Sequence, residues 1–439
     1  MSRSLRIAMF VGEFPVASET FITRQITGLL DLGHDVHIFA NAKNDDPVRH
    51  ESIARYRLLE RTTYVEGPPE SIFWEMPVTP LRERTWPPGK EDSVSNTSRL
   101  VHAFPALIRC GLTAPRLTYS VLDIREYGYR ADSLSGVYRL RTLLKRGGKF
   151  DVLHAHFGPV GNCFRFARAL FGAPLIVSFH GYDFSTVPRK EGPKVYDRLF
   201  ERTDVVTANS EYTKTRLEAL GCPRDKMRNL PVGFNPDEFA FRARRFETGK
   251  PVRILTVARL VEIKGYEYML RALARLRNQF PNFQYDIVGD GPLRDSLGLL
   301  ASKLNLTDVV HFHGARSEGD VRQFFSNAHL FMLGSVNIDG DEEGQGLVLQ
   351  EAQACGLPVI ATRHGAFHEG VAPENRYWLV PERDVDALAL KMQQLIEANG
   401  QWPTLGLAGR SFVEKRYDIR VLNQRLVEIY GDAIQNFRA

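Results

Sequence analysis

The stretch LRIAMFVGEFPVASETFITRQITGLLDLGHDVHIFA (residues 5–40) decides the fold class. It begins with a nearly continuous apolar run over 5–11, the pattern of a strand that is buried on both faces. Apolar residues then recur at helical spacing over 20–33, and Gly33 stands where a helix commonly ends. A second apolar run over 35–40 completes a strand, helix, strand unit. Such units build parallel sheets, so the sequence predicts an α/β protein.

The same alternation continues along the chain, apart from a less regular segment in which helices are expected over 99–110 and 134–146. The polar stretch RARRFETGKP (242–251) has no apolar periodicity and predicts a linker between two domains. Ligands of such sheets bind beyond the carboxyl ends of the strands, and a cleft between two sheets is the expected site. The predicted organisation is a first domain over 1–240 with an irregular insert at 41–148, a second domain over 241–417, and a helix at 418–439 that crosses back to the first domain.

The composition fits a globular protein of two or three domains, with 439 residues, 43% of them hydrophobic and 25% charged. The net charge of +5 is a mild excess and does not predict a nucleic-acid partner. No apolar stretch reaches the roughly 18 residues that a spanning helix needs, and the N-terminal run is too short for a signal peptide. The four scattered cysteines predict neither a zinc site nor a disulfide framework, which fits a cytoplasmic protein.

Two local runs are more basic than the rest of the chain, RLRTLLKRGGK at 139–149 and RARR at 242–245. One interpretation is a solvated helix face and a solvated linker. The other is a surface that rests on anionic lipid, as in a peripheral protein at the inner face of the cytoplasmic membrane. Both interpretations stay open at this point.

The stretch DEEGQGLVLQEAQACGLPVIAT (341–362) predicts an acidic glycine-rich loop, a short helix and a buried strand. Accessible backbone N–H groups at 344–346 and the positive end of the helix suit a phosphate. Because phosphate repels carboxylates, Glu343 and Glu351 are expected to face hydroxyl groups, such as those of a ribose or a sugar. The alternative is an acidic surface loop with a solvated helical glutamate.

Arg259 and Lys264 flank a short turn directly after a predicted strand. A guanidinium and an ammonium can together neutralise a diphosphate in place of a metal ion. Two ordinary surface cations are the alternative. The stretch VGDGP (288–292) ends another strand, and its Gly289 and Gly291 either let a ligand ring approach the backbone or form a plain turn.

In the first half, His180 of SFHGYD is expected at the carboxyl end of a strand, where it either faces the cleft or serves the structure. HAHF (154–157) offers two more histidines, but carboxylate partners for a metal are missing. The first loop, GEFPVASETF, is placed to touch a phosphate or an acceptor, with Ser18 and Thr20 as candidate helix caps.

Several nucleotide motifs are absent from the sequence. It has no P-loop signature and no G-x-G-x-x-G after the first strand, and GQGLVL (344–349) fails at the third glycine. The Asp-x-Asp pair in DGD (339–341) lies in a predicted loop and is interpreted as solvated charge. No metal site is predicted.

Together, these motifs resemble those of a known family. The chain is similar to retaining glycosyltransferases of the GT-B fold, in family 4. The similarity lies in a strand followed by R-x-x-x-x-K-G, then GDGP, then E-G-x-G-x-x-x-x-E-A-x-A-x-G-x-P-V-I-A-T. EFPVASETF, SFHGYD and EEGQGLVLQEA look most like exopolysaccharide enzymes of the colanic acid and amylovoran type. The resemblance implies two Rossmann-like βαβ domains that face each other across a cleft.

The resemblance also implies a role for each matching residue, and no cofactor, because the nucleoside diphosphate sugar is a co-substrate. By this resemblance, the donor diphosphate contacts Arg259 and Lys264, the donor sugar contacts Glu343 and His180, and the ribose contacts Glu351. The phosphates and the ribose also meet the backbone of Gly346, Leu347 and Val348. The base lies near Gly289, Gly291, Pro292 and Arg316, and Gly12 lines the first loop.

The implied reaction moves a sugar, with retention, from a UDP- or GDP-sugar to a glycan or lipid-linked saccharide acceptor in polysaccharide biosynthesis. The alternatives are a nucleotide-sugar 2-epimerase of the same fold, a sugar phosphorylase and a non-catalytic sugar-nucleotide binding subunit. Two departures stand out. Gln345 replaces an apolar residue that is common in the related enzymes, which bears on the donor sugar. In HGAFHE (364–369), His-Gly replaces Gly-Gly, whereas Glu369 keeps the acidic position.

Overall fold

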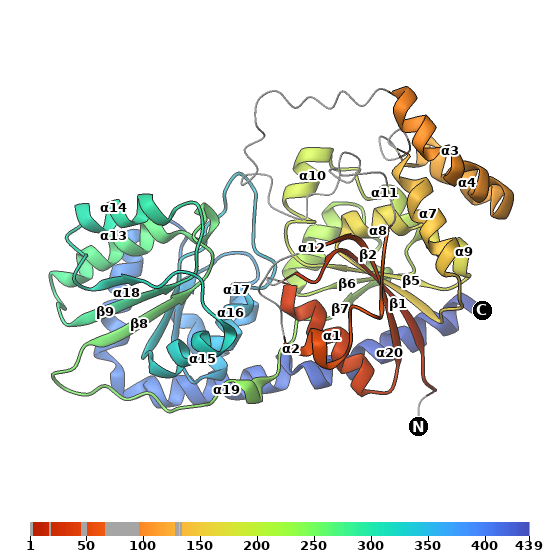
Figure 1. Ribbon diagram of the computed structural model, residues 1–439. Coiled ribbons are helices and arrows are strands. Elements are labelled where there is room, and N and C mark those ends of the chain that lie inside the picture. The colour runs from red at the N-terminus through yellow and green to blue at the C-terminus, as the bar shows by residue number, and fades with distance from the viewer. Residues whose placement is uncertain are drawn as a thin grey trace. The chain divides into compact units, whose positions relative to one another are not determined.

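The computed structural model describes residues 3–16, 19–44, 51–65, 96–127, 131 and 134–438. Ser18, one of the two predicted caps, lies outside these residues. Within the described residues the chain forms two compact units, drawn in Figure 1. The first unit takes the described residues of 1–208, 214–230 and 423–439, and the second unit takes 209–213 and 231–422. The two units are described separately below.

The first unit is built on seven parallel strands in the order β3-β2-β1-β4-β5-β6-β7. The strands are β1 (Arg6–Phe14), β2 (Asp35–Lys43), β3 (Thr62–Tyr64), β4 (Val152–His156), β5 (Leu175–Phe179), β6 (Val205–Ala208) and β7 (Met227–Asn229). The helices are α1 (Thr20–Asp31), α2 (Glu51–Arg55), α3 (Asn96–Thr113), α4 (Pro115–Leu122), α5 (Ile124–Tyr127), α7 (Ser135–Arg146), α8 (Gly158–Phe164), α9 (Ala167–Phe171), α10 (Thr186–Glu191), α11 (Asp197–Arg202), α12 (Glu211–Ala219, whose first residues belong to the second unit) and most of α20 (Ile419–Arg438).

The second unit has six parallel strands in the order β10-β9-β8-β11-β12-β13. They are β8 (Val252–Val257), β9 (Phe283–Val288), β10 (Val310–Phe312), β11 (Leu330–Leu333), β12 (Val359–Thr362) and β13 (Leu379–Val380). The helices are α13 (Tyr266–Arg277), α14 (Arg294–Lys303), α15 (Glu318–Asn327), α16 (Leu347–Ala354), α17 (Phe367–Gly370), α18 (Val385–Glu397) and α19 (Trp402–Tyr417).

The opening stretch folds largely as its pattern predicts. β1 pairs in parallel with β2, with Ile7 opposite Val36. Gly33 takes the left-handed conformation with φ +84°, and the next residue, His34, donates its N–H to the carbonyl of Leu29, which closes α1. The strand is longer than expected, because β1 continues to Phe14. Gly12 therefore lies buried inside β1 rather than in the loop that follows it.

Apolar side chains from the second sheet pack on both of its faces. One cluster combines the sheet with Leu270 of α13, Leu297 of α14 and Leu388 of α18. The other combines it with Phe325 of α15 and Leu349 of α16, among others. A parallel sheet covered by helices on both sides is the expected outcome for strands that are apolar throughout.

The sequence is a poor guide around 242–251 and at 402–417. Arg244 is buried, and its guanidinium donates to the carbonyls of Ser326, Phe325 and Cys355. This part of the polar stretch is thus anchored inside the second unit and is not a solvated linker. The long helix α19 has no counterpart among the expected helices, because Gly406 and Gly409 weaken its pattern, yet both glycines pack closely against Gly356 and Gln353.

Among the described residues, none of the helices combines the length and the apolar character that crossing a membrane would need. All four cysteines are buried free thiols.

Candidate functional site

The strand order of the second unit sets the place of a site. β8 lies between β9 and β11, and the sheet grows in opposite directions from this point. Loops that leave two such neighbouring strands diverge and open a crevice at the carboxyl ends, where α/β sheets bind ligands. The loop after β8 carries Arg259 and Lys264, and the loop after β11 carries Glu343. The predicted donor residues therefore share one edge of the sheet.

Lys264 and Glu343 form an ion pair in this position. The ammonium nitrogen lies 2.8 Å from each carboxylate oxygen, and the two side chains are only 15% and 14% exposed. Glu343 Oε1 also accepts a hydrogen bond of 2.7 Å from the hydroxyl of Ser335. Two residues that the sequence assigned to different parts of the donor thus contact each other directly.

Glu343 keeps its negative charge although the side chain is buried. Burial is the largest single influence and raises the pKa of the carboxyl. The Lys264 ammonium, then His364, and then the hydrogen bonds from Lys264 and Ser335 together outweigh it, so the pKa is lowered from its ordinary value. Glu343 is therefore a carboxylate at neutral pH, and two of the three N–H donors of Lys264 are directed at it.

His364 holds the backbone of Glu343. Its Nε2 accepts the N–H of Glu343 at 3.0 Å, which places the ring proton on Nδ1. Nδ1 in turn donates to the carboxylate of Glu382 at 2.7 Å, and His364 is fully buried. The sequence predicted only an altered turn at this histidine. Its place directly after a strand, at the sheet edge where Glu343 lies, is the signal that could have identified it.

Two glycines allow the loops to approach closely enough for this pairing. Gly265 has φ +64°, and a Cβ there would lie 1.8 Å from the carbonyl oxygen of Gly334, just after β11. Gly289, after β9, would bring a Cβ within 2.0 Å of the carbonyl oxygen of Ala258. Neither position can hold a side chain. Backbone contact between the three loops therefore fixes the position from which Lys264 extends.

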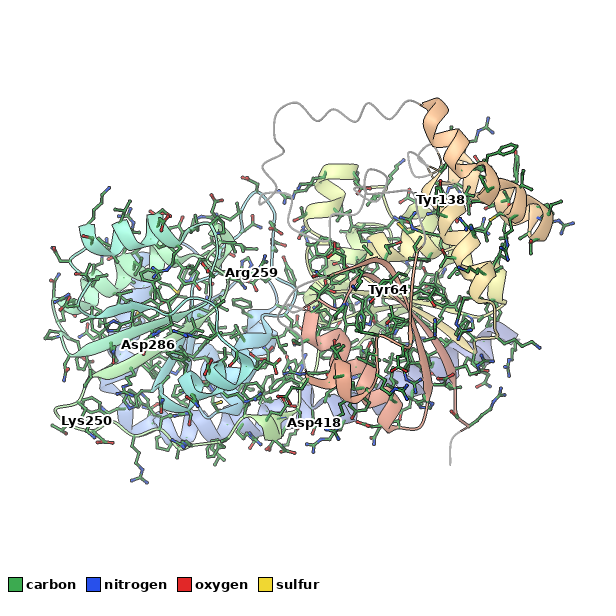
Figure 2. All side chains as sticks on the ribbon, viewed as in Figure 1. Tyr64, Tyr138, Lys250, Arg259, Asp286 and Asp418 are labelled. Atoms are coloured by element: carbon green, nitrogen blue, oxygen red, sulfur yellow. The ribbon has the colours of Figure 1, made fainter. Side chains whose placement is uncertain are left out.

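The remaining predicted base and phosphate contacts follow the same strand ends. Arg259, labelled in Figure 2, is exposed in the loop after β8. Gly289, Gly291 and Pro292 form the loop after β9, and Arg316 is exposed between β10 and α15. Because all these strands are parallel, the loops lie along one edge of the sheet.

α16 begins with the residues predicted to meet phosphate. Gly346 precedes the helix in the left-handed conformation, with φ +70°, and as a glycine it offers no side chain to cap the first N–H groups. Leu347 and Val348 open the helix, and Glu351 lies in its second turn, as predicted. An N-terminus capped only by glycine, at the edge of the sheet, is the usual form of an anion site.

In the first unit, the corresponding strand ends carry histidines. β1 and β4 are the neighbours at which the strand order reverses, and His156 ends β4 while His180 follows β5. His156 Nδ1 and His180 Nε2 are 3.1 Å apart, and the two rings are stacked. Burial, and secondarily His156, lowers the pKa of His180 well below its ordinary value. Burial also lowers the pKa of His156, to about 3. Both rings are neutral.

Asp183 fixes the backbone around His180. Its buried carboxylate accepts the N–H groups of His180 at 3.0 Å, of Gly181 at 2.8 Å and of Gly158 at 3.3 Å. Burial raises the pKa of Asp183 to about 6, although these backbone hydrogen bonds act in the opposite direction. The spacing in HGYD thus has a structural reason, since the aspartate ties the loop after β5 to the start of α8.

Glu19, at the end of the first loop, is a candidate that the sequence did not single out. Burial, and then the nearby Glu13, raises the pKa of Glu19 to about 8. The residue directly precedes α1, and Phe21 of that helix packs against His180 with ring centroids 4.8 Å apart. A carboxyl that keeps its proton at neutral pH can donate as well as accept a hydrogen bond.

His154, the first histidine of HAHF, serves the structure. His154 bonds Tyr430 of α20 at 2.6 Å through Nδ1 and Ser178 at 2.7 Å through Nε2. In the part of the chain that the structure describes, no group of three or more His, Cys, Asp or Glu side chains is arranged to hold a metal ion.

Comparison with known proteins identifies the family. The model of the family described as glycosyl transferases group 1 matches residues 237–406, and that of the glycosyl transferase 4-like domain matches residues 17–233. The chain is 32% identical to the proposed colanic acid biosynthesis glycosyltransferase WcaL of Escherichia coli K12, over 97% of this chain and 99% of that protein. The chain belongs to the group 1 glycosyltransferases. It is also 30% identical to the amylovoran biosynthesis glycosyltransferase AmsK of Erwinia amylovora, over the same shares of both chains.

A solved structure supports the fold of this glycosyltransferase. Anabaena HepE, crystallised in complex with UDP, superimposes with a TM-score of 0.66 at 17% identity and covers 98% of this chain and 100% of its own. The predicted GT-B architecture of two Rossmann-like domains is confirmed.

Gln345 has a structural role in this glycosyltransferase that the sequence did not predict. Its side-chain oxygen accepts the N–H of Val232 at 2.7 Å, and its amide nitrogen donates to the Val232 carbonyl at 2.9 Å and to Gln350 at 3.2 Å. The residue is only 6% exposed. At this departure from the family pattern, the Gln345 side chain clamps the backbone of Val232.

Glu369 likewise has a structural partner. Its carboxylate accepts the N–H groups of Glu211 at 2.9 Å and of Tyr212 at 2.8 Å, at the N-terminus of α12. Because the first N–H groups of a helix generally need acceptors from outside it, the glutamate acts as a cap supplied by another part of the chain.

Proposed function

We propose that this glycosyltransferase moves a sugar from a nucleoside diphosphate sugar to a saccharide acceptor in exopolysaccharide biosynthesis, with retention of the anomeric configuration. The observation that carries the proposal is the Lys264–Glu343 pair at the point where the strand order of the second sheet reverses. The acceptor class follows the colanic acid and amylovoran enzymes to which the chain is similar along nearly its whole length.

The proposed step breaks the bond between the anomeric carbon and the diphosphate oxygen. A bond from the acceptor oxygen to the same carbon forms, on the face that the diphosphate leaves. The acceptor proton passes to the departing phosphate oxygen. The atoms therefore balance without a further reactant, and the barrier lies in the negative charge that grows on the diphosphate.

Cations and N–H groups of the second unit stabilise that charge. Lys264 is held by Glu343, Arg259 extends from the same loop, and the N-terminus of α16 begins at Leu347. Fixed groups of this kind are effective because they need no reorganisation during the reaction. Glu343, which accepts from Lys264 and Ser335, and Glu351 are assigned to hydroxyl groups of the sugar and the ribose. His180, in the first unit, stays a predicted contact of the donor sugar.

The nucleotide is tested with a panel of UDP-, GDP- and ADP-sugars, with thermal stabilisation of the protein as the readout for binding. We expect one nucleotide class to stabilise the protein and Arg259→Ala to reduce that effect. Free nucleoside diphosphate should form only when a saccharide acceptor is added. Conversion of the donor sugar without an acceptor would instead indicate an epimerase.

The reaction is proposed to need neither a cofactor nor a metal ion, since Arg259 and Lys264 take the place of a cation. Activity is therefore expected to persist in EDTA. Loss of activity in EDTA, restored by a divalent cation, would contradict this part of the proposal and would direct attention to the Asp-x-Asp pair at 339–341.

A further inference from the structure

The outward face of α3 carries a row of exposed apolar side chains. Phe104, Ile108 and Leu112 follow one another at intervals of four residues and are 62%, 48% and 82% exposed. Residues at this spacing lie on one face of a helix. Tyr119 of α4 and Ile124 of α5 are 77% and 64% exposed and continue the apolar character beyond the end of α3. We refer to these five residues as the apolar ridge.

The opposite side of α3 already serves the core of the first unit. Ala103, Ala106 and Cys110 are buried, and the thiol of Cys110 points at the carbonyl of Val137 in α7. α3 is therefore apolar on two opposed faces. A helix that is apolar all round is normally covered on all sides, so the ridge calls for a partner other than the core of this unit.

Positive charge predominates around the ridge. Asn96–Leu122 contains no aspartate or glutamate, while Arg109 and Arg116 are exposed beside the ridge. Exposed Arg125 adds a third positive charge in α5. Of the two carboxylates that follow α4, Glu126 is paired with Arg202 at 3.0 Å and with Arg198 at 3.7 Å, and Asp123 receives the N–H of Arg125.

We propose that the apolar ridge docks this glycosyltransferase on an anionic membrane surface. Large apolar side chains enter the boundary between headgroups and acyl chains, and the arginines beside them meet lipid phosphates. A second copy of the chain suits the ridge less well, because a symmetric contact would bring the surface that carries Arg109 and Arg116 against the same positive surface of the copy. The positive rim thus selects an anionic partner.

The apolar ridge is a different surface from the basic run at 139–149, in which Lys145, Arg146 and Lys149 are exposed. Arg139 is buried and donates to Asn41 and Ser135, so it is unavailable to lipid. The proposal does not rest on the donor or on the reaction, since it concerns the first unit alone and binding is measured without substrates. A protein docked in this way would meet saccharide acceptors that are carried on lipid.

The test is co-sedimentation of the full chain with two kinds of vesicle, pure phosphatidylcholine and phosphatidylcholine mixed with phosphatidylglycerol. We expect binding to the mixed vesicles that weakens as salt is added. The double variant Ile108→Ser/Leu112→Ser should weaken binding about tenfold or more, because it removes several buried methylene groups from the bilayer boundary. Arg109→Gln/Arg116→Gln should weaken it about fivefold for each arginine.

The matched control is Leu299→Ser/Leu407→Ser, which removes two exposed leucines of the second unit. It should bind vesicles as the wild type does. Thermal unfolding of every variant verifies that the fold is intact. The proposal is overturned if the wild type ignores mixed vesicles, or if the control weakens binding as much as the ridge variant. It is also overturned if the ridge variant changes only the oligomeric state, since the ridge would then bind a second copy.

Discussion

The two units place different chemistry at equivalent positions of their sheets. In the second unit, the strand ends at the reversal of the order carry an ammonium and a carboxylate that keep their charges in contact. In the first unit, the corresponding ends carry neutral histidines. Charge suits a diphosphate, whereas neutral hydrogen-bonding groups suit the uncharged hydroxyls of a saccharide. In the proposed reaction, this difference assigns the diphosphate leaving group to the second unit.

The largest effect is expected at Lys264, in the second unit. Lys264→Ala should lower kcat by roughly 10²–10³, because it removes a fixed cation from the growing charge of the diphosphate. Burial should then dominate at Glu343 and raise its pKa. Steady-state kinetics with the preferred donor measures the loss, and Lys303→Ala, at an exposed lysine in the last turn of α14, is the matched control.

The double variant Lys264→Ala/Glu343→Gln separates two roles of the lysine. It removes the carboxylate that the single variant leaves without its cation, so stability should recover. The value of kcat should stay low. A single variant that folds and turns over at a near-normal rate would disprove the assignment of Lys264 to the diphosphate.

The next-largest effect is expected in the first unit, at the buried carboxyl of Asp183. The pKa of Asp183 is raised from 3.8 to about 6, so the folded state binds the proton more tightly than the unfolded state. The associated stability is fully present below pH 3.8 and is lost as the pH rises through about 6. The unfolding free energy of the wild type minus that of Asp183→Asn should therefore fall by about 3 kcal/mol over this interval. Urea unfolding at a series of pH values measures it. A difference that rises with pH would mean that the backbone hydrogen bonds, and not burial, dominate at Asp183.

The sequence predicted the fold well, for identifiable reasons. Periodicity located strands and helices, and the parallel order then brings Arg259 and Lys264 to the same sheet edge as Glu343. It failed where a polar side chain bonds to backbone far away in the chain. Arg244, Gln345 and His364 each do this, and their partners are visible only once the chain is folded.

A moderate effect is expected at Gln345. Gln345→Leu restores an apolar side chain but leaves the N–H and carbonyl of Val232 without their partners, which should cost about 1–3 kcal/mol of unfolding free energy. Gln345→Glu is the matched variant, because it keeps an acceptor for the N–H and loses the donor to the carbonyl. The ratio of kcat/KM between two donor sugars should be unchanged in both. A tenfold change in that ratio at unaltered stability would return Gln345 to the donor site.

The smallest effect is expected at Glu369, and it separates charge from hydrogen bonding at the start of α12. Glu369→Gln keeps one acceptor for the N–H groups of Glu211 and Tyr212 but removes the negative charge, which should cost about 0.5–1 kcal/mol. Glu369→Ala removes both and should cost more. Because salt screens the charge, the loss in Glu369→Gln should shrink as salt is added, whereas the additional loss in Glu369→Ala should persist. Urea unfolding at low and high salt measures both, with Glu374→Gln at an exposed site as the control. Equal losses for the two variants at every salt concentration would show that the charge alone holds α12.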